Sequence, residues 1–411
     1  MSENKTENLI YYLCFIAFAF PLLPNFLRNV LMALLVITVI ISYFSSKVNK
    51  NINVKLIFLG SSLYLTYLLS MFWTDNIDLG LKKLSTGLPL LVFPIIAGLL
   101  SKDVINRLRN KIHYLLGIYA ISVLLTFIVF FLIFIDHYGY SLVQHFPTVI
   151  NKDLGPYNIH PIYMSMHGAV SIIISLYLLH KVDFNRWQLL LIILCDILIV
   201  CFMLILIKKG PIISMVISSA YLVLALKNRK IVLILSILTA ILTSVIIFQP
   251  KVNRKFSELL NINNANKTEL TSTNIRLIIY DCGKELVPDA GLFGFGVGDT
   301  RGKLLDCYES KNHELLKSKY NSHNQFLSII LRSGFLGLFC YLLFLLYLFI
   351  RSLFSKSYLV IAILVFYTLV MLSENILERE DGVVYVSFIT LILFVLFNYS
   401  NVEKITYHGQ K

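Results

Sequence analysis

The chain has 411 residues, of which 57% are hydrophobic and only 14% are charged. Its mean hydropathy is +0.76, and apolar runs of about 17–25 residues recur, the length that a helix needs to cross a membrane. This composition excludes an ordinary soluble domain, in which roughly 25% of residues are charged, and it predicts an all-α polytopic membrane protein embedded in a lipid bilayer. The net charge of +13 does not predict a nucleic-acid partner, because basic residues in membrane proteins mark cytoplasmic loops.

The apolar runs predict about twelve transmembrane helices. Helices 1 to 9 are expected in 1–249, a periplasmic loop domain with short helices in 250–322, and helices 10 to 12 in 323–411. Pro89 and Pro94 are expected to kink the fourth helix. The predicted spans are 9–27, 29–45, 54–73, 84–100, 112–135, 160–180, 188–207, 210–226, 230–248, 323–350, 357–375 and 383–400.

The distribution of basic residues predicts which segments lie on each side of the membrane. With the N-terminus in the cytoplasm, the short cytoplasmic segments hold 17 lysines and arginines, and the short outer segments hold 7. Because cytoplasmic loops carry the excess of these residues, both termini are expected to be cytoplasmic. The outer segments are then 136–159, 208–209, 250–322 and 376–382.

The interval 250–322 is too long for a simple connection and too polar to span. A short helix is expected to start near Thr273, a good N-cap residue, and Arg276 and Tyr280, four residues apart, would share one of its faces. A flexible loop is expected at 261–268 and a second surface helix at 302–320. Four glycines are expected to form turns: Gly291, Gly294, Gly296 and Gly298.

Two of the six cysteines, Cys282 and Cys307, also fall in this interval. In an oxidising compartment they could form a disulfide. Two free thiols are the alternative, because the sequence does not give the distance between their Cα atoms.

Three basic residues are candidates for binding an anionic group on the outer face. The guanidinium of Arg276 is always charged and matches the geometry of phosphate. Lys208 and Lys209 interrupt two apolar runs, and charges at membrane depth are functional candidates. The alternatives are a solvated or headgroup-anchoring role for Arg276 and simple snorkelling of the two lysines to the interface.

Two histidines lie where outer segments meet predicted spans. His323, followed by Asn324, could accept a proton as a general base, because a neutral imidazole titrates near neutral pH; a polar cap is the alternative. His160 and Tyr163 open the sixth span, would share a face and could contact a sugar, whereas helix capping and interface anchoring are their alternative roles.

An acidic cluster precedes the last span. Glu374 could orient a basic residue or an acceptor hydroxyl there, and an exposed ion-pair cluster is the alternative. No H-E-x-x-H, Asp-x-Asp or Cys/His cluster is present in the sequence, so we expect no metal site and no cofactor. The remaining members of the cluster are Glu378, Arg379, Glu380 and Asp381.

These segments, in this order, resemble the O-antigen ligase / O-antigen polymerase superfamily of bacterial membrane glycosyltransferases. The resemblance covers about 160–382. Its most specific part is the His-Asn entry to a span after a long outer loop with an arginine and a glycine-rich segment. The segments are H-P-I-Y at 160–163, a basic residue with glycine at 208–210, N-I-R-L-I-I-Y at 274–280, G-F-G-V-G-D at 294–299, S-H-N-Q-F-L at 322–327, G-F-L-G at 334–337 and S-E-N-I-L-E-R at 373–379.

The resemblance implies a C-type glycosyltransferase fold in the bacterial inner membrane, with its active site facing the periplasm. It implies an undecaprenyl-diphosphate-linked glycan as donor, a lipid A–core or glycan hydroxyl as acceptor, and no metal. Arg276 would hold the diphosphate and His323 would act on the acceptor hydroxyl. The family's usual Ser-Arg-Gly is Lys208-Lys209-Gly210 here, and its usual tryptophan is Tyr280; a lysine keeps the charge but loses the planar fork.

Three functions remain open at this point. A ligase would join a finished glycan to lipid A–core, and a polymerase would join repeat units with the same chemistry. A transporter or flippase of lipid-linked sugars is the third; it needs charges deep within several spans, whereas the polar residues here crowd one outer face. Arg332 and Asp196 are the exceptions, and Arg332 is expected to snorkel to the outer end of its span.

Overall fold

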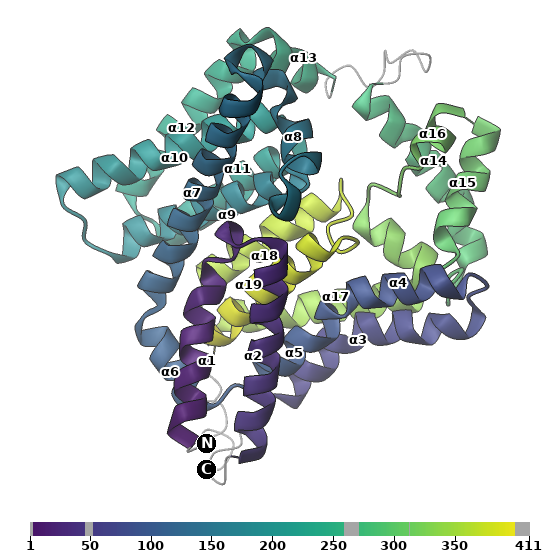
Figure 1. Cartoon of the computed structure of the whole chain (residues 1–411), viewed down its shortest axis with the longest axis horizontal. Helices are drawn as coiled ribbons and strands as arrows, with labels where there is room; N and C mark the ends of the chain where they lie inside the picture. Colours follow the sequence, from purple (N-terminus) through teal and green to yellow (C-terminus); the bar gives the residue numbers. More distant parts are fainter. Residues whose placement is uncertain (1–2, 46–51, 259–270, 312, 399–411) are drawn as a thin grey trace.

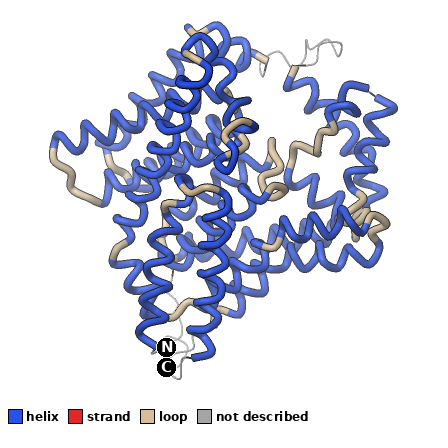
Figure 2. The backbone as a smooth tube through the Cα atoms, viewed as in Figure 1, coloured by secondary structure: helices blue, strands red, loops and turns tan. Residues whose placement is uncertain are grey.

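The computed structural model describes residues 3–45, 52–258, 271–311 and 313–398. Within these ranges all the regular structure is helical (Figures 1 and 2). The first half contains α1 Glu3–Phe18, α2 Asn25–Ser45, α3 Val54–Ser70, α4 Ile77–Gly87, α5 Pro89–Leu99, α6 Lys102–Asn110, α7 Ile112–Tyr138, α8 Phe146–Lys152, α9 Pro161–Lys181 and α10 Arg186–Leu206. The second half contains α11 Lys209–Leu226, α12 Arg229–Phe248, α13 Pro250–Ser257, α14 Ser272–Ala290, α15 Thr300–Lys311, α16 His313–Ser318, α17 Gln325–Phe354, α18 Tyr358–Met371 and α19 Glu380–Asn398.

Ten stretches in the described part of the chain are helical, long and apolar enough to cross a membrane. They coincide with ten of the twelve predicted spans, so the protein is a multi-pass membrane protein. The other two expected spans are shorter helices: α1 stops at Phe18, and α18 has 14 residues. The fourth span begins at Ile77 rather than at 84, and it is divided where α4 ends and Pro89 opens α5.

The helices surround a buried centre. α9 and α19 are almost wholly buried, and α18 and α19 lie near the middle of the view in Figure 1. The peripheral helices instead expose large apolar side chains, among them Phe44, Phe58, Leu224 and Phe354. Exposed apolar surface of this extent fits contact with lipid rather than with water.

The bundle has two distinct ends, and α1 runs from one toward the other. Near the start of α1, the hydroxyl of Ser101 donates to Glu7 at 2.6 Å, and α6 packs against both α1 and α19. Beyond the far end of α1, the guanidinium of Arg28 contacts Asp381 at 2.8 Å. Segments that the charge bias assigns to one side of the membrane therefore meet at one end of the molecule, although which compartment each end faces remains a prediction.

Within the polar interval, α14, α15 and α16 form a small helical unit beside the bundle, whereas α13 packs against α12 (Figure 1). α14 is longer than expected, and its N-cap is Thr271, whose hydroxyl accepts from the backbone N–H of Asn274 at 3.2 Å; the expectation of a cap at Thr273 was wrong. α14 and α15 are joined by a disulfide between Cys282 and Cys307, whose Cα atoms are 5.9 Å apart. The expected second surface helix is present as α15 and α16, and the expected loop at 261–268 lies outside the described residues.

The glycine-rich segment at 291–298 connects this unit to a break in α17 through backbone hydrogen bonds. Ser333 and Gly334 interrupt the helical geometry of α17, and the N–H groups of Phe295 and Gly296 donate to carbonyls of the preceding turn at 2.9 and 3.1 Å. Gly334 has a φ of +66°, and a Cβ added there would lie 2.1 Å from the carbonyl oxygen of Leu292. The glycines are needed for close backbone approach, and their turns, three of them at positive φ, are confirmed.

Candidate active site

The two predicted catalytic residues, Arg276 and His323, lie near the N-terminal ends of α14 and α17. His323 immediately precedes α17, whose N-cap is Asn324; its side chain accepts from the N–H of Leu327 at 3.0 Å. His323 has a φ of +42°, which is unusual for a residue with a side chain and is found at functional sites when the surroundings fix it. Arg276 lies on the first turns of α14, on the same face as Tyr280, as expected from their spacing.

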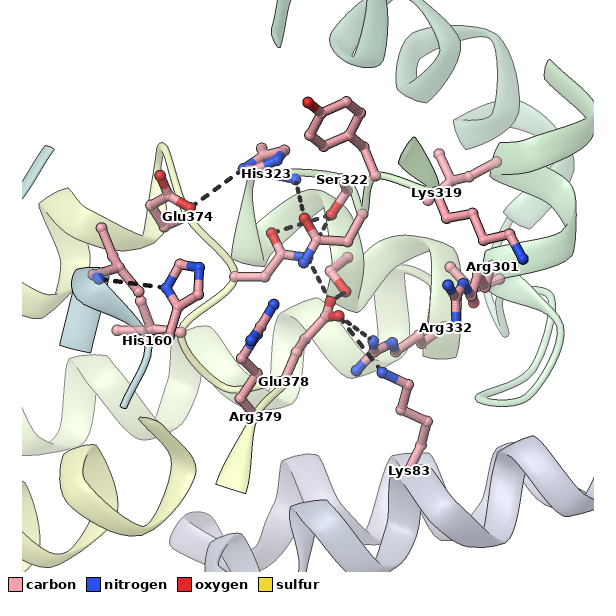
Figure 3. A pocket seen from close by; sticks show the side chains of 18 of the residues that line it. Lys83, His160, Arg301, Lys319, Ser322, His323, Arg332, Glu374, Glu378 and Arg379 are labelled. Atoms are coloured by element: carbon pink, nitrogen blue, oxygen red, sulfur yellow. Dashed lines mark hydrogen bonds and ion pairs between the residues drawn. The ribbon is translucent and has the colours of Figure 1, made fainter. Parts of the chain in front are cut away.

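Glu374 connects Arg276 with His323. One carboxylate oxygen accepts from Nη2 of Arg276 at 2.5 Å. The other lies 3.3 Å from Nδ1 of His323, the contact drawn in Figure 3. When Nδ1 of the neutral ring carries the proton and donates it to Glu374, Nε2 carries the lone pair. A carboxylate that fixes the tautomer of a histidine in this way prepares the other ring nitrogen to accept a proton.

The hydroxyl of Tyr280 completes this arrangement. It donates to the carbonyl oxygens of His323 at 3.1 Å and of Leu372 at 3.2 Å. The amide of Asn324 also donates to the carbonyl of Leu372, at 3.2 Å. Tyr280 and Asn324 therefore hold the backbone around His323 and before Glu374 in place.

Charge accumulates around Glu374. Burial alone would raise the pKa of Glu374, but the hydrogen bond from His323 and the charges of Arg276 and Lys208 hold it below its ordinary value. Burial lowers the pKa of the Lys208 amine, and Glu374 opposes this effect. A Cβ on Gly210 would lie 2.7 Å from the hydroxyl of Ser373, which shows how closely the turn that carries Lys208 approaches Glu374.

The two lysines of that turn differ in their surroundings. The amine of Lys209 contacts Glu258 at 3.0 Å and the hydroxyl of Thr273 at 3.4 Å. Lys209 therefore ties α11 to α13 and α14. Lys208 has no carboxylate within 4.0 Å in the described part of the chain, and of the two lysines it is the one whose charge acts on Glu374.

A cavity of about 400 Å³ opens beside His323 and Glu374 (Figure 3). His160 and Tyr163 line it on one side. Nδ1 of His160 accepts from the N–H of Ile162 at 3.4 Å, and burial with the nearby cations lowers the pKa of His160 to about 3. His160 is therefore neutral at neutral pH, caps α9 and keeps an N–H on its other nitrogen. Arg276 does not line this cavity and contacts it only through Glu374.

A second buried carboxylate, Glu378, lies deeper in the same cavity. Nη2 of Arg332 contacts it at 2.8 Å, and Nζ of Lys83 lies 3.9 Å away. Ser328 and Asn375 donate further hydrogen bonds. Burial would raise the pKa of Glu378, but Arg332 and Lys83, with these hydrogen bonds, hold it below its ordinary value.

The expectation that Arg332 snorkels outward was wrong. Its side chain is only 7% exposed and points to Glu378, because Arg332 immediately precedes the break in α17. The signal that could have found this pair was an arginine inside an apolar run together with an acidic cluster near a span, since such a charge needs a partner. Asp196, the other exception, is buried and accepts from the hydroxyl of Ser175 at 2.7 Å.

Within the part of the chain that the structure describes, no three His, Cys, Asp or Glu side chains gather as a metal site would require. The predictions of no metal and no cofactor continue to rest on the sequence. The groups that can hold a ligand here are fixed cations, the imidazoles of His160 and His323, and the two carboxylates.

The fold and the site define a multi-pass helical membrane protein with a charged, water-accessible cavity at one end of its helices. Residues 194–342 match the model of a family described as O-antigen ligase, and over this range the resemblance to the O-antigen ligase / O-antigen polymerase superfamily is confirmed. The matched range contains Lys208, Arg276 and His323, and it ends before Glu374. No curated protein matches the sequence.

Proposed function

We propose that this protein is a membrane glycosyltransferase of the O-antigen ligase type. It would move a glycan from undecaprenyl diphosphate to a hydroxyl of lipid A–core, or a similar acceptor, on the periplasmic face of a bacterial inner membrane. The observation that carries the proposal is the contact of one carboxylate, Glu374, with both Arg276 and His323 beside a polar cavity. The family match supports the reaction class.

The donor diphosphate is assigned to the side of Glu374 where Arg276 and Lys208 lie. Nε of Arg276 is buried without a hydrogen-bond partner in the described residues, so the guanidinium has a donor left for a phosphate oxygen. Lys208 adds a second charge without a close carboxylate. Because negative charge grows on the diphosphate as the glycosyl bond breaks, fixed cations at this point stabilise the transition state more than the ground state.

The acceptor is assigned to the cavity side, where His323 is exposed to it. The acceptor hydroxyl gives its proton to Nε2 of His323 while its oxygen forms a bond to the anomeric carbon. The bond between that carbon and the diphosphate oxygen breaks, and undecaprenyl diphosphate leaves with the electron pair. Such general-base assistance contributes about 10²–10⁴-fold to a rate.

The test of this site is glycan transfer in a deletion strain complemented with variants. Arg276→Ala removes one charged donor, and we expect a loss of about 10²–10³-fold; His323→Ala should lose about 10²–10⁴-fold. Lys284→Ala is the matched control, because Lys284 is exposed on the same helix as Arg276. Full activity of both site variants would reject the proposed reaction.

The same deletion strain separates the ligase from its alternatives by gel electrophoresis of the glycans. Loss of a ligase leaves bare core and accumulates long lipid-linked chains. Loss of a polymerase leaves core with one repeat unit, and loss of a flippase leaves the lipid-linked unit on the cytoplasmic leaflet. We expect the ligase pattern. The polymerase or flippase pattern would instead reject the ligase and support that other function.

A further inference from the structure

A second cavity adjoins the one beside His323. It has a volume of about 390 Å³, and the two cavities share part of their walls. The shared residues are Leu79, Lys83, Arg301, Glu378 and Arg379. A molecule larger than one sugar could therefore extend from the proposed general base, past Glu378, into this second space.

One face of α4 lines the second cavity. Leu79, Lys82, Lys83 and Thr86 are spaced as i, i+3, i+4 and i+7, and all four contribute to its wall. Residues at this spacing lie on one side of a helix. α4 opens a candidate membrane span, and this arrangement turns its two lysines toward the cavity instead of toward lipid, where they would be costly.

The carboxylates around the second cavity are already paired. Asp381 contacts Arg28 at 2.8 Å, and Glu380 accepts from the amide of Asn29 at 2.7 Å. The third, Glu378, is held by Arg332 at 2.8 Å. The amide of Asn29 is neutral, so Glu380 keeps its negative charge, but none of the three carboxylates lies within 4.0 Å of Lys82, Arg301 or Arg379, and the wall holds five cations against these three carboxylates.

Three cations of the wall are not paired with any described carboxylate. Among the residues that the structure describes, Lys82, Arg301 and Arg379 have no carboxylate within 4.0 Å. Arg301 is the second residue of α15, where the helix dipole disfavours a positive charge, so its own helix gives no reason for an arginine there. Arg301, Arg379 and Lys83 line both cavities, and Figure 3 shows Lys83, Arg301, Arg332 and Arg379 around Glu378.

We propose that this wall is a second anion subsite, separate from Arg276 and Lys208, which binds a phosphate or carboxylate carried by the acceptor saccharide. Its defining residues are Lys82, Arg301 and Arg379, and arginine suits both anions because its planar fork pairs with them bidentately. The assignment to the acceptor rests on the proposed function, since the subsite adjoins the cavity that holds the proposed general base. The lining is polar, which fits a sugar rather than an acyl chain.

The test measures binding without any donor, so it does not depend on transfer. Purified full-length protein in phosphatidylcholine nanodiscs is titrated with a soluble oligosaccharide that carries one phosphate monoester. The same oligosaccharide after phosphatase treatment is the uncharged reference. We expect the wild type to bind the phosphorylated form roughly tenfold more tightly or better, the size of a charged hydrogen bond.

Arg301→Gln and Arg379→Gln should each lose most of this preference, and Arg301→Lys should keep part of it. Lys303→Gln is the matched control, because Lys303 is exposed on the same helix as Arg301 and outside both cavity walls. An unchanged preference in both glutamine variants, or no preference in the wild type, would overturn the subsite.

Two further arms separate the possible explanations. Arg276→Ala and His323→Ala should retain the preference, so full transfer activity of both variants with intact binding would remove the proposed reaction and leave the subsite standing. Nanodiscs that contain phosphatidylglycerol test a lipid headgroup as the ligand. If that lipid competes with the phosphorylated sugar in the wild type but not in Arg301→Gln, the site binds lipid and the saccharide assignment is wrong.

Discussion

At the scale of single residues, Glu374 makes two contacts that have opposite effects on the proposed reaction. Its contact with His323 prepares that ring to accept a proton, whereas its contact with Arg276 occupies the cation that would hold the diphosphate. A donor that binds Arg276 must therefore compete with this carboxylate. The arrangement keeps two basic groups in position before the substrate arrives, and it avoids a buried charge without a partner.

We predict that Glu374→Gln separates the two roles. The amide keeps the size of the side chain but loses the charge that orients His323, so kcat should fall by about tenfold to a hundredfold, less than for Arg276→Ala. The KM for the donor should not rise, because Arg276 is freed. Steady-state transfer with purified protein gives both constants, and a raised donor KM with unchanged kcat would contradict this assignment.

The buried pair Arg332 and Glu378 gives a second prediction, about stability. Arg332→Met leaves Glu378 buried with Lys83, at 3.9 Å, as its remaining cation within 4.0 Å among the described residues, and removing one partner of a buried ion pair costs about 3–5 kcal/mol. Adding Glu378→Gln should restore most of the loss. Thermal unfolding in detergent at neutral pH measures both changes.

The sign of the pH dependence follows from the same pair. Because the pKa of Glu378 is below its ordinary value, its contribution to stability is complete above about pH 4.3, the ordinary glutamate pKa, and is lost as pH falls through the depressed value. Unfolding of the wild type should therefore be more sensitive to acid than unfolding of Glu378→Gln. Equal acid sensitivity, or no rescue in the double variant, would show that the two charges do not stabilise each other.

At the scale of elements, the break in α17 determines where the cavity residues point. The helix starts at Gln325 and is interrupted at Ser333 and Gly334, and the glycine-rich segment donates backbone hydrogen bonds to the turn before the break. The break aims Arg332 at Glu378 instead of along the membrane. The glycine-rich segment thus acts on the site through the backbone of α17.

We predict that Gly334→Ala disturbs both stability and transfer. An added Cβ would lie 2.1 Å from the carbonyl oxygen of Leu292, at a φ of +66°, so the contact between the two backbones must open. Gly302→Ala is the matched control, since a Cβ there meets nothing within 4 Å, and a helical alanine in place of glycine is favourable by roughly 0.5–1 kcal/mol. Thermal unfolding and transfer of the two variants decide; equal behaviour would mean that the break does not depend on Gly334.

Much of the arrangement of helices could be predicted from the sequence, because it depends on apolar runs and on the spacing of residues along one helix. The apolar runs located ten spans. The spacing of Arg276 and Tyr280 placed both on one face of α14, and in the structure this face contacts Glu374 and the carbonyl of Leu372. The partners of Glu378 could not be predicted. Its two cationic partners, Lys83 and Arg332, come from α4 and α17, and the break in α17 and the packing of α4 bring them together.

At the scale of the whole molecule, every proposed step depends on which compartment the charged end faces. The distribution of basic residues predicts that it faces outward. The disulfide between Cys282 and Cys307 in the adjoining helical unit agrees independently, because disulfides persist in the periplasm and are rare in the cytoplasm. A loop of this length contributes about 3.5 kcal/mol in the chain-entropy account, so the unit that carries Arg276 would be markedly weaker in a reducing compartment.

We predict that the two ends of the molecule differ in their access to a membrane-impermeant maleimide. Asp289 is exposed on α14 at the charged end, and Asn110 is exposed at the end of α6, near the opposite end. In a Cys201→Ser background, which removes the exposed native thiol, Asp289→Cys should react in intact spheroplasts and Asn110→Cys only after the membrane is broken. The native disulfide blocks Cys282 and Cys307, so the background itself is the control for labelling. If Asn110→Cys alone reacted in intact spheroplasts, the charged cavity would face the cytoplasm, and a periplasmic acceptor could not reach His323.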